Sequence, residues 1–318
     1  MSDLSIGLLD YPLGYRGATL NEHRSTAGAE VVAQRLKTFL VERFDFSRLQ
    51  LRDQKSGLHL VSGGDFGSAT KTFRYLSLLG MVKDTTQALL EDRISKLIQT
   101  FDIEESQYAS ITTQGVSRLD FYCPTGAPPT GFASPVHECF LARPSAHPQI
   151  FERRGNSLSV MFALELACAD HRRYLYDATA KTANAGDSWS IACPNWDANM
   201  GEMTYPVLHY ILTSTGSVDC TARFTPTTVG SVTDLVLDLT SLTAAAHTVD
   251  VDMQTGRVYL DGSIDPLTRV ATGTRRDDLL VSDPDTFWGI PRNGGTFAVP
   301  TGRTALTSVA ATYRQARG

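Results

Sequence analysis

The sequence lacks the features that mark membrane, secreted and nucleic-acid-binding proteins. No apolar run approaches the roughly 20 residues that a bilayer-spanning helix needs. Residues 1–14 have neither the basic flank nor the unbroken apolar stretch of a signal peptide. The net charge of −5 gives no general attraction for a phosphate backbone or an anionic membrane. We therefore expect a folded chain made in the cytoplasm, with no nucleic acid partner and no membrane insertion.

Cysteines are few and irregularly placed. The chain has five, an odd number, and they lie far apart in mostly apolar surroundings. This pattern favours reduced, buried thiols over a disulfide framework. No Asn-x-Ser/Thr acceptor occurs either, so nothing indicates a secreted glycoprotein.

Motifs for catalysis and for phosphate or zinc binding are incomplete. Cys168-x-x-His171 has no second Cys/His pair at finger spacing, and residues 137–139 lack the elements of a zinc deaminase. Residues 62–72 are rich in Gly, but Thr70 stands where a phosphate loop needs Gly. No Gly-x-Ser-x-Gly or His-Glu-x-x-His occurs. The sequence thus predicts neither an enzyme nor a bound cofactor or metal.

One calcium alternative stays open at Asp250 and Asp252. With Gly256 they faintly match a calcium loop, although the Gly at the sixth position and the late Glu of an EF-hand are missing. Period-two alternation places both carboxylates on the outer face of a strand. The alternative to a solvated face is a looser site completed by Asp261 or Asp265.

The length and a composition shift predict two domains. A chain of 318 residues exceeds the usual size of one domain. After Lys181 no lysine follows, and short alternating runs separated by turn signals replace helical spacing. We expect an α+β domain over residues 1–178 and an all-β sandwich or jelly-roll domain over residues 179–318, mainly β in total.

The first domain is expected to be a sheet flanked by one helix. Residues 46–83 hold three short apolar runs that read as strands. Residues 29–44 fit either a helix or a strand, and the Pro- and Gly-rich residues 110–155 indicate long loops between few strands. Asp84 is the predicted N-cap of a helix from Thr85 to Phe101, whose apolar positions recur at helical spacing.

The two faces of that helix have different expected roles. Its apolar stripe should lie on the sheet, because Leu90 and Leu97 are separated by seven residues and fall on one side. The other side projects Asp92, Ser95, Lys96 and Gln99 outward, either as a solvated face or as a contact surface for a partner.

Residues 232–262 give the clearest local pattern in the second domain. Alternating apolar residues precede and follow residues 254–256, which contain Gly256. Alternation on both sides of a Gly-containing turn predicts a β-hairpin, with Val249, Val251 and Met253 facing inward. By itself this pattern indicates only an antiparallel sheet.

Four segments together resemble the C-terminal domain of siphophage distal tail proteins. In chain order they are a stretch leading into a Tyr-Pro-Val strand (Asn199–Leu208), the hairpin (Val249–Gly262), an aromatic pair followed by a tight turn (Phe287–Gly295), and a strand ending in Tyr-Arg (Val309–Arg314). The helix at 85–101 and the segment Ala169–Tyr174 resemble the family's first domain. Residues 299–302 depart from the family's usual Pro-Gly-like turn.

The resemblance implies a structural protein of a bacteriophage tail tip. It implies that copies of the first domain form a ring, a hexamer around the tail channel, and that the second domain is a galectin-like β-sandwich. It further implies contacts with the tail tube protein and with tail tip hub or fibre proteins. In such a ring Asp92, Lys96 and Gln99 are interface candidates. So are Arg275 and Arg276, which pair either with acidic residues of the next copy or locally.

Two alternative functions remain open at this stage. A carbohydrate-binding β-module would use exposed aromatic side chains to stack on sugars, and Trp196 and Trp288 are its candidates, although Trp288 also fits a core position. A tail-associated hydrolase would need a catalytic pair, and the sequence shows none.

Overall fold

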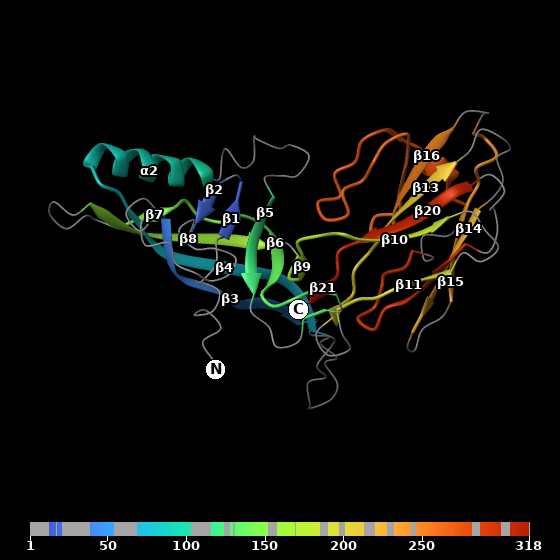
Figure 1. Ribbon diagram of the computed structural model, residues 1–318, viewed down its shortest axis with the longest axis horizontal. Coiled ribbons are helices and arrows are strands. Elements are labelled where there is room, and N and C mark those ends of the chain that lie inside the picture. Colours follow the sequence, from blue (N-terminus) through green and yellow to red (C-terminus); the bar gives the residue numbers. More distant parts are fainter. Residues whose placement is uncertain are drawn as a thin grey trace, which may run out of the picture. The chain divides into compact units, whose positions relative to one another are not determined.

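The computed structural model describes residues 13–16, 18–20, 39–53, 69–102, 116–123, 128–129, 131–151, 158–168, 170–184, 190–196, 201–212, 220–227, 232–242, 246–281, 287–299 and 306–317. The chain divides into two compact units (Figure 1). Unit 1 comprises Met1–Ala127 and Ala133–Arg173, and unit 2 comprises Pro128–Phe132 and Tyr174–Gly318. Antiparallel strands dominate both, so the predicted mainly β fold class is confirmed. No helix in the described ranges is long and apolar enough to cross a membrane.

Unit 1 is a strand-rich body, and its described residues include one helix. Its described strands are β1 (Leu13–Tyr15), β2 (Ala18–Leu20), β3 (Phe39–Asp53), β4 (Ala69–Lys83), β5 (Ser117–Cys123), β6 (Val136–Pro144), β7 (Gln149–Ile150) and β8 (Ser159–Cys168). β4 lies between β3 and β8, and β5 lies between β1 and β6, all antiparallel. Of the undecided stretch 29–44, the described part, from Phe39 onward, is strand.

Strict alternation in β4 and β8 creates the core of unit 1. In β8 every second residue from Val160 to Cys168 is buried, and the residues between them are half-buried. Buried β4 residues such as Leu76 and Leu78 join the same apolar cluster, together with Phe121 and Phe140. One face of this sheet is therefore the core face.

Helix α2 (Gln87–Thr100) covers that core, as Figure 1 shows. Leu90 and Leu97 are buried in the cluster, which confirms the predicted stripe. The predicted N-cap is wrong by two residues: the Thr86 side chain, not Asp84, accepts the hydrogen bond from the Leu89 N–H. Asp84 instead accepts a hydrogen bond from the Thr85 N–H at 2.6 Å.

Unit 2 contains a sandwich of two sheets. Its described elements are β9 (Arg173–Leu175, starting at the boundary), β10 (Thr179–Asn184), β11 (Ser190–Cys193), β12 (Gly201–Glu202), β13 (Val207–Leu212), β14 (Cys220–Pro226), β15 (Thr233–Leu237), β16 (His247–Asp252), β17 (Arg257–Leu260), β18 (Thr274–Arg275), η2 (Asp277–Leu279), β19 (Gly295–Ala298), β20 (Leu306–Tyr313) and β21 (Ala316–Arg317). One sheet has the order β10-β20-β13-β16-β17-β18, and the other has the order β11-β19-β14-β15. The inward side chains of both sheets form a single core.

The predicted hairpin is confirmed as β16 and β17. Val249, Val251 and Met253 are fully buried in the sandwich core. Gly256 occupies the turn with φ of +69°, a conformation that an L side chain rarely adopts. A Cβ there would also lie 2.6 Å from the Phe287 ring. The turn therefore requires glycine for two independent reasons.

Asn195 joins three segments of unit 2. Its Oδ1 accepts hydrogen bonds from the N–H groups of Trp196 at 2.9 Å and Ala316 at 3.2 Å. Its Nδ2 donates to the carbonyl oxygen of Glu202 at 2.7 Å and lies 3.3 Å from that of Ile290. The buried side chain thus binds the end of the chain to two earlier segments.

The strand that ends in Tyr-Arg, and the residues that follow it, contact the neighbours of Asn195 in the chain. The Tyr313 hydroxyl donates to the Pro194 carbonyl oxygen at 2.6 Å. The Arg317 guanidinium lies 4.4 Å from the centre of the Trp196 ring, at cation–π distance. These contacts give the terminal motif a structural role.

The Pro- and Gly-rich region has more strand than the composition indicated. Strands β5 and β6 lie within residues 110–155 and place Phe121, Cys139 and Phe140 at full burial. The apolar residues of these strands decide the structure, because β5 pairs with β6 along its whole length.

All five cysteines are buried and none forms a disulfide, which confirms the sequence prediction. Burial raises the pKa of the Cys168, Cys193 and Cys220 thiols to about 12. Since the thiolate is the reactive form, these groups are chemically inert in the folded chain.

Candidate assembly surface

Unit 1 presents a second sheet face that the core does not use. Across β4 and β8 the register brings Met81 opposite Met161 and Leu79 opposite Ala163. These side chains point away from the core, because their neighbours Leu78 and Val82 are buried in it, and they are half-buried. The face therefore carries apolar surface that remains partly accessible.

The same face continues into a polar region. Ser77 lies opposite Glu165, and Asp45 of β3 lies opposite Ser77 on the other side. The Ser145 hydroxyl donates a hydrogen bond to Glu165 Oε1 at 2.8 Å. Two carboxylates and two hydroxyls thus meet beside the apolar rows.

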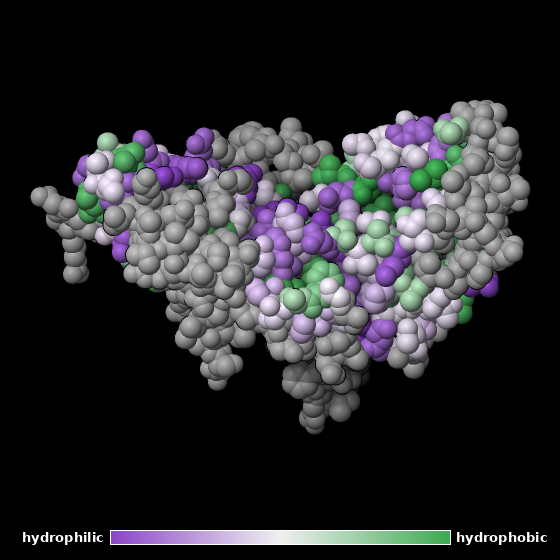
Figure 2. Space-filling view, viewed as in Figure 1, coloured by the Kyte–Doolittle hydropathy of each residue, from purple (hydrophilic) through white to green (hydrophobic). Residues whose placement is uncertain are grey.

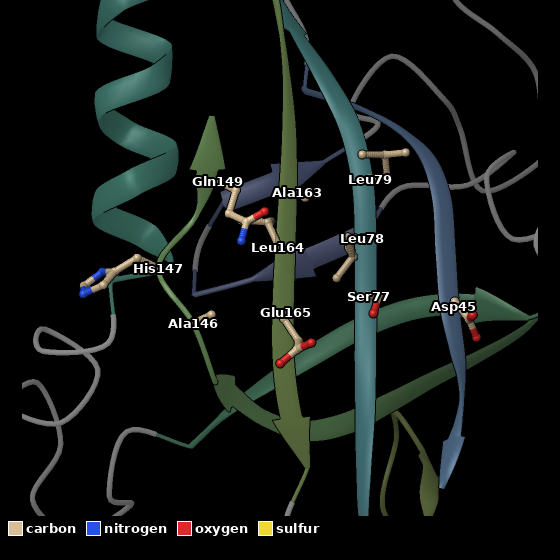
Figure 3. A pocket seen from close by; sticks show the side chains of 10 residues that line it. All are labelled: Asp45, Ser77, Leu78, Leu79, Ala146, His147, Gln149, Ala163, Leu164 and Glu165. Atoms are coloured by element: carbon tan, nitrogen blue, oxygen red, sulfur yellow. The ribbon is translucent and has the colours of Figure 1, made fainter. Parts of the chain in front are cut away.

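A hollow of about 380 Å³ opens in this region. Figure 3 shows that its lining comes from β3, β4, β8, β7 and the segment between β6 and β7. His147 and Gln149 border it, with Asp45, Ser77 and Glu165 on the strands. The hollow is shallow and mixed in polarity, a shape suited to a contacting side chain more than to an enclosed small molecule.

The outer face of α2 holds the helix residues predicted as interface candidates. Asp92, Lys96 and Gln99 are all exposed there. They accompany two large apolar side chains, Leu89 at 44% exposure and Ile98 at 39%. Figure 2 shows this mixture of hydrophilic and hydrophobic groups along the helix. The sequence analysis predicted the polar residues of this face and missed the two apolar ones. Leu89 and Ile98 lie outside the apolar stripe in the helical spacing, and this position could have indicated their exposure.

Strand β3 offers a third kind of contact. Within the described residues it forms a ladder with β4 on one side only, from Phe39 to Asp53. A long edge strand exposes backbone N–H and C=O groups that can pair with another chain. Bulges at Val41/Arg43, Asp45/Arg48 and Leu49/Leu51 interrupt the ladder and bend the strand.

In unit 2 the two candidate arginines have acidic partners in their own chain. Arg275 Nε donates to Asp277 Oδ2 at 2.7 Å, and Arg276 Nη2 lies 2.8 Å from Asp278 Oδ2. Both pairs are solvent-exposed, and pairing lowers the pKa of each carboxyl group. Within the single chain, Arg275 and Arg276 therefore form the local ion pairs that were one of the two expectations for them.

The tryptophans proposed as a sugar platform are in the interior. Trp196 and Trp288 are each only 4% exposed. Trp288 stacks on Phe224 with ring centres 4.4 Å apart and belongs to the sandwich core. Stacking on a glycan needs an accessible ring face, so this expectation is wrong for both residues.

The carboxylates of Asp250 and Asp252 are buried too, and the expectation of a solvated outer face is wrong. Each is 3% exposed. Asp250 accepts from the Ile264 N–H at 3.0 Å, and Asp252 accepts from Arg269 Nη1 at 2.9 Å. Among the described residues no group of three or more His, Cys, Asp or Glu side chains is placed to hold a metal ion. Cys168 is buried in the core beside a half-buried His171.

Comparison with known proteins shows that the fold of this chain is similar to folds of solved phage proteins. No protein-family model and no curated protein matches the sequence. The structure is similar to that of the SPP1 Dit protein, described as a paradigm of the hub adsorption apparatus in phages infecting Gram-positive bacteria. The TM-score is 0.57 at 14% identity, covering 95% of this chain and 98% of that one.

Two structures of the phage p2 baseplate in its activated conformation, with Sr and with Ca, also match. Their TM-scores are 0.43 and 0.41 at 9% and 10% identity, over 86% and 85% of this chain and 90% of each matched chain. The Dit match spans both units, which confirms the fold that the resemblance implied.

Proposed function

We propose that this chain is a non-enzymatic structural component of a long-tailed bacteriophage virion, a distal tail protein at the tail tip. Copies of it form a ring, a hexamer, that joins the tail tube to the tip hub or fibre proteins. The observation that carries the proposal is the likeness of fold to the SPP1 Dit protein along almost the whole of both chains. Assembly takes place in the host cytoplasm.

Unit 1 has the surfaces that a ring subunit needs. A closed ring uses a heterologous interface, in which one patch of a subunit meets a different patch of the next. The outer face of α2, the half-buried rows of β4 and β8, and the edge of β3 are three different patches on one body. Strand pairing supplies direction and register, and the apolar side chains supply the burial that stabilises association.

The strand pattern explains why unit 1 benefits from partners. The segment from Arg74 to Lys83 is apolar at Leu79 and Met81 as well as at the core positions. A strand that is apolar on both faces is typical of sheets covered on both sides. Burial of the second face against another subunit would stabilise unit 1 in proportion to the area removed from water.

The oligomeric mass of the purified chain tests the proposal. Light scattering and negative-stain electron microscopy should show closed rings of about six copies. A chain that stays monomeric at high concentration, and that antibodies fail to detect in virions, would refute it.

Two sets of substitutions locate the interface. The triple variant Asp92→Ala, Lys96→Ala, Gln99→Ala changes only exposed positions of α2, and we expect it to shift rings toward monomers. The double variant Arg275→Ala, Arg276→Ala is the matched alternative in unit 2. If only the second variant dissociates the ring, the interface lies in unit 2 and the role of α2 is refuted.

A further inference from the structure

The segment between β17 and β18, residues 261–272, forms a closed loop that we call the strap. Its two ends meet at a pair of glycines. A Cβ on Gly262 would lie 2.0 Å from the Thr272 carbonyl oxygen, and one on Gly273, where φ is +88°, would lie 2.6 Å from the Leu260 carbonyl oxygen. Within the strap, Ile264 and Ala271 form a β-bridge. A compact surface loop with adjoining ends is an Ω-loop, a type that is frequently functional.

Two buried carboxylates of β16 hold the strap against the outer face of the sheet. Asp250 and Asp252 point away from the core, because the alternate residues Val249 and Val251 face it. Asp250 Oδ2 accepts the Ile264 N–H at 3.0 Å. Asp252 Oδ1 lies 2.9 Å from Arg269 Nη1.

The Arg269 side chain completes the second of these contacts. Its Nη2 donates to the Tyr205 carbonyl oxygen at 2.7 Å, just before β13. Arg269 itself has a φ of +59°, so its backbone is strained in the closed strap. Beyond its first residue, Asp261, which hydrogen-bonds with Thr248 of β16, the strap is held by each of the two carboxylates.

The two points differ in the partner that balances the buried charge. Asp252 faces a guanidinium, which stays charged at every physiological pH. Asp250 instead forms a hydrogen bond with His209 Nδ1 on the neighbouring strand β13. The His209 side chain is 33% exposed while the Asp250 side chain is 4% exposed, so the imidazole is in contact with solvent and the carboxylate is covered. A buried carboxylate is costly unless it is both paired and hydrogen-bonded.

We propose that the strap is a pH-sensitive device: protonated His209 keeps Asp250 compensated and the strap closed, and deprotonation loosens the strap from the sheet. Opening would expose the apolar side chains of Ile264 and Leu267, which are 7% and 6% exposed in the closed form. It would also free the Asp250 carboxylate for other hydrogen-bond donors.

The surroundings of His209 leave Asp250 as the dominant partner. On the other side of β13, His209 pairs with Ala310 of β20, which has no charge. Asp250 pairs with Tyr259 of β17 across the hairpin. The other titratable or charged groups on this face are Asp252 with Arg257 opposite it, and Tyr259 with Arg275 opposite it. The strap adds Asp261, which pairs with His247, Asp265, which Arg314 influences, and Arg269.

The direction of the pH effect follows from the same contact. The hydrogen bond with Asp250 raises the pKa of His209 above its ordinary value of 6.5, with burial opposing it. A group whose pKa is raised by folding contributes stability that is fully present below its unfolded pKa. That stability is lost as the pH rises through the raised pKa of the native state. The strap should therefore be tightest in mildly acidic solution and looser above neutrality.

Hydrogen exchange on the full chain tests this proposal. Exchange would be followed by mass spectrometry between pH 5.5 and 9, and each rate divided by that of the unfolded chain at the same pH. We expect protection of the strap peptides to fall by roughly threefold or more as His209 loses its proton. Peptides of β14 and β15 serve as the internal reference and should stay unchanged.

Two histidine variants assign the effect to one side chain. His209→Asn keeps a side-chain donor near Asp250 and removes the titration, so strap protection should become independent of pH. His247→Asn is the matched control, because His247 lies 3.0 Å from Asp261 at the start of the strap and pairs with a half-exposed carboxylate. It should leave the pH dependence intact.

The wild-type series is decisive even if a variant fails to fold. Strap protection that follows the reference strands at every pH overturns the proposal. So does a pH dependence that survives in His209→Asn, or one that disappears in His247→Asn alone. Asp250→Asn, which keeps the acceptor for Ile264 without a charge, should also remove the pH dependence.

Discussion

Replacing Asn195 by alanine removes the side chain that joins three segments of unit 2. The variant leaves two buried N–H groups, those of Trp196 and Ala316, without their acceptor. It also removes the donor to the Glu202 carbonyl oxygen. The change is small in volume, so lost hydrogen bonds and not a cavity dominate its effect.

The expected loss of stability follows from these contacts. Each buried donor left unsatisfied costs about 1–3 kcal/mol, which gives about 2–6 kcal/mol for two. For a unit of this size such a loss lowers the melting temperature by on the order of 10 °C. The loss is confined to unit 2, since every hydrogen bond of Asn195 lies within it.

Tryptophan fluorescence measures this unit selectively. All three tryptophans, Trp189, Trp196 and Trp288, belong to unit 2. The urea midpoint followed by fluorescence should drop in Asn195→Ala. The exposed neighbour Arg292→Ala should stay within about 0.5 kcal/mol of wild type. A shift below about 1 kcal/mol in Asn195→Ala would refute the view that this amide holds the segments together.

Three further predictions concern both units. Leu90→Ala, which empties a fully buried position under α2, should lower the free energy of unfolding, followed by circular dichroism, by about 2–5 kcal/mol. Leu89→Ala, at a position that is 44% exposed, should lower it far less, and equal losses would contradict the assigned helix face. Gly256→Ala should destabilise unit 2 by about 1–3 kcal/mol in the fluorescence assay, because of the positive φ and the Phe287 ring; an unchanged midpoint would argue against this turn. A thiol reagent at pH 8 should leave the native chain unmodified and label all five cysteines after unfolding, because all five are buried and burial raises the pKa of the Cys168, Cys193 and Cys220 thiols. Rapid native labelling would count against the buried positions of Cys123, Cys139, Cys168, Cys193 and Cys220.

Local patterns predicted the elements whose stabilising contacts are close in sequence. The helix at Gln87–Thr100 and the hairpin around Gly256 follow from spacing and turn chemistry alone. The helix start was misplaced because Asp84 and Thr86 are both good capping residues, and only geometry shows which side chain reaches the Leu89 N–H.

The errors concern burial, which depends on contacts distant in sequence. Asp250 alternates with buried valines and so looked solvent-facing, but the strap covers it. Trp196 is covered in part by Arg317, more than a hundred residues later. Alternation tells which side of a strand a residue occupies and gives no information on what covers that side.

The pairing of the first and last strands of the sandwich determines how late in synthesis the sandwich can finish folding. β10 pairs with β20, so this edge of the sandwich can form only after Tyr313 has been synthesised. At common elongation rates the interval between these strands is on the order of ten seconds. Unit 1 can complete its β4–β8 ladder within that interval. Nascent chains should therefore hold a folded unit 1 while the sandwich of unit 2 is still open.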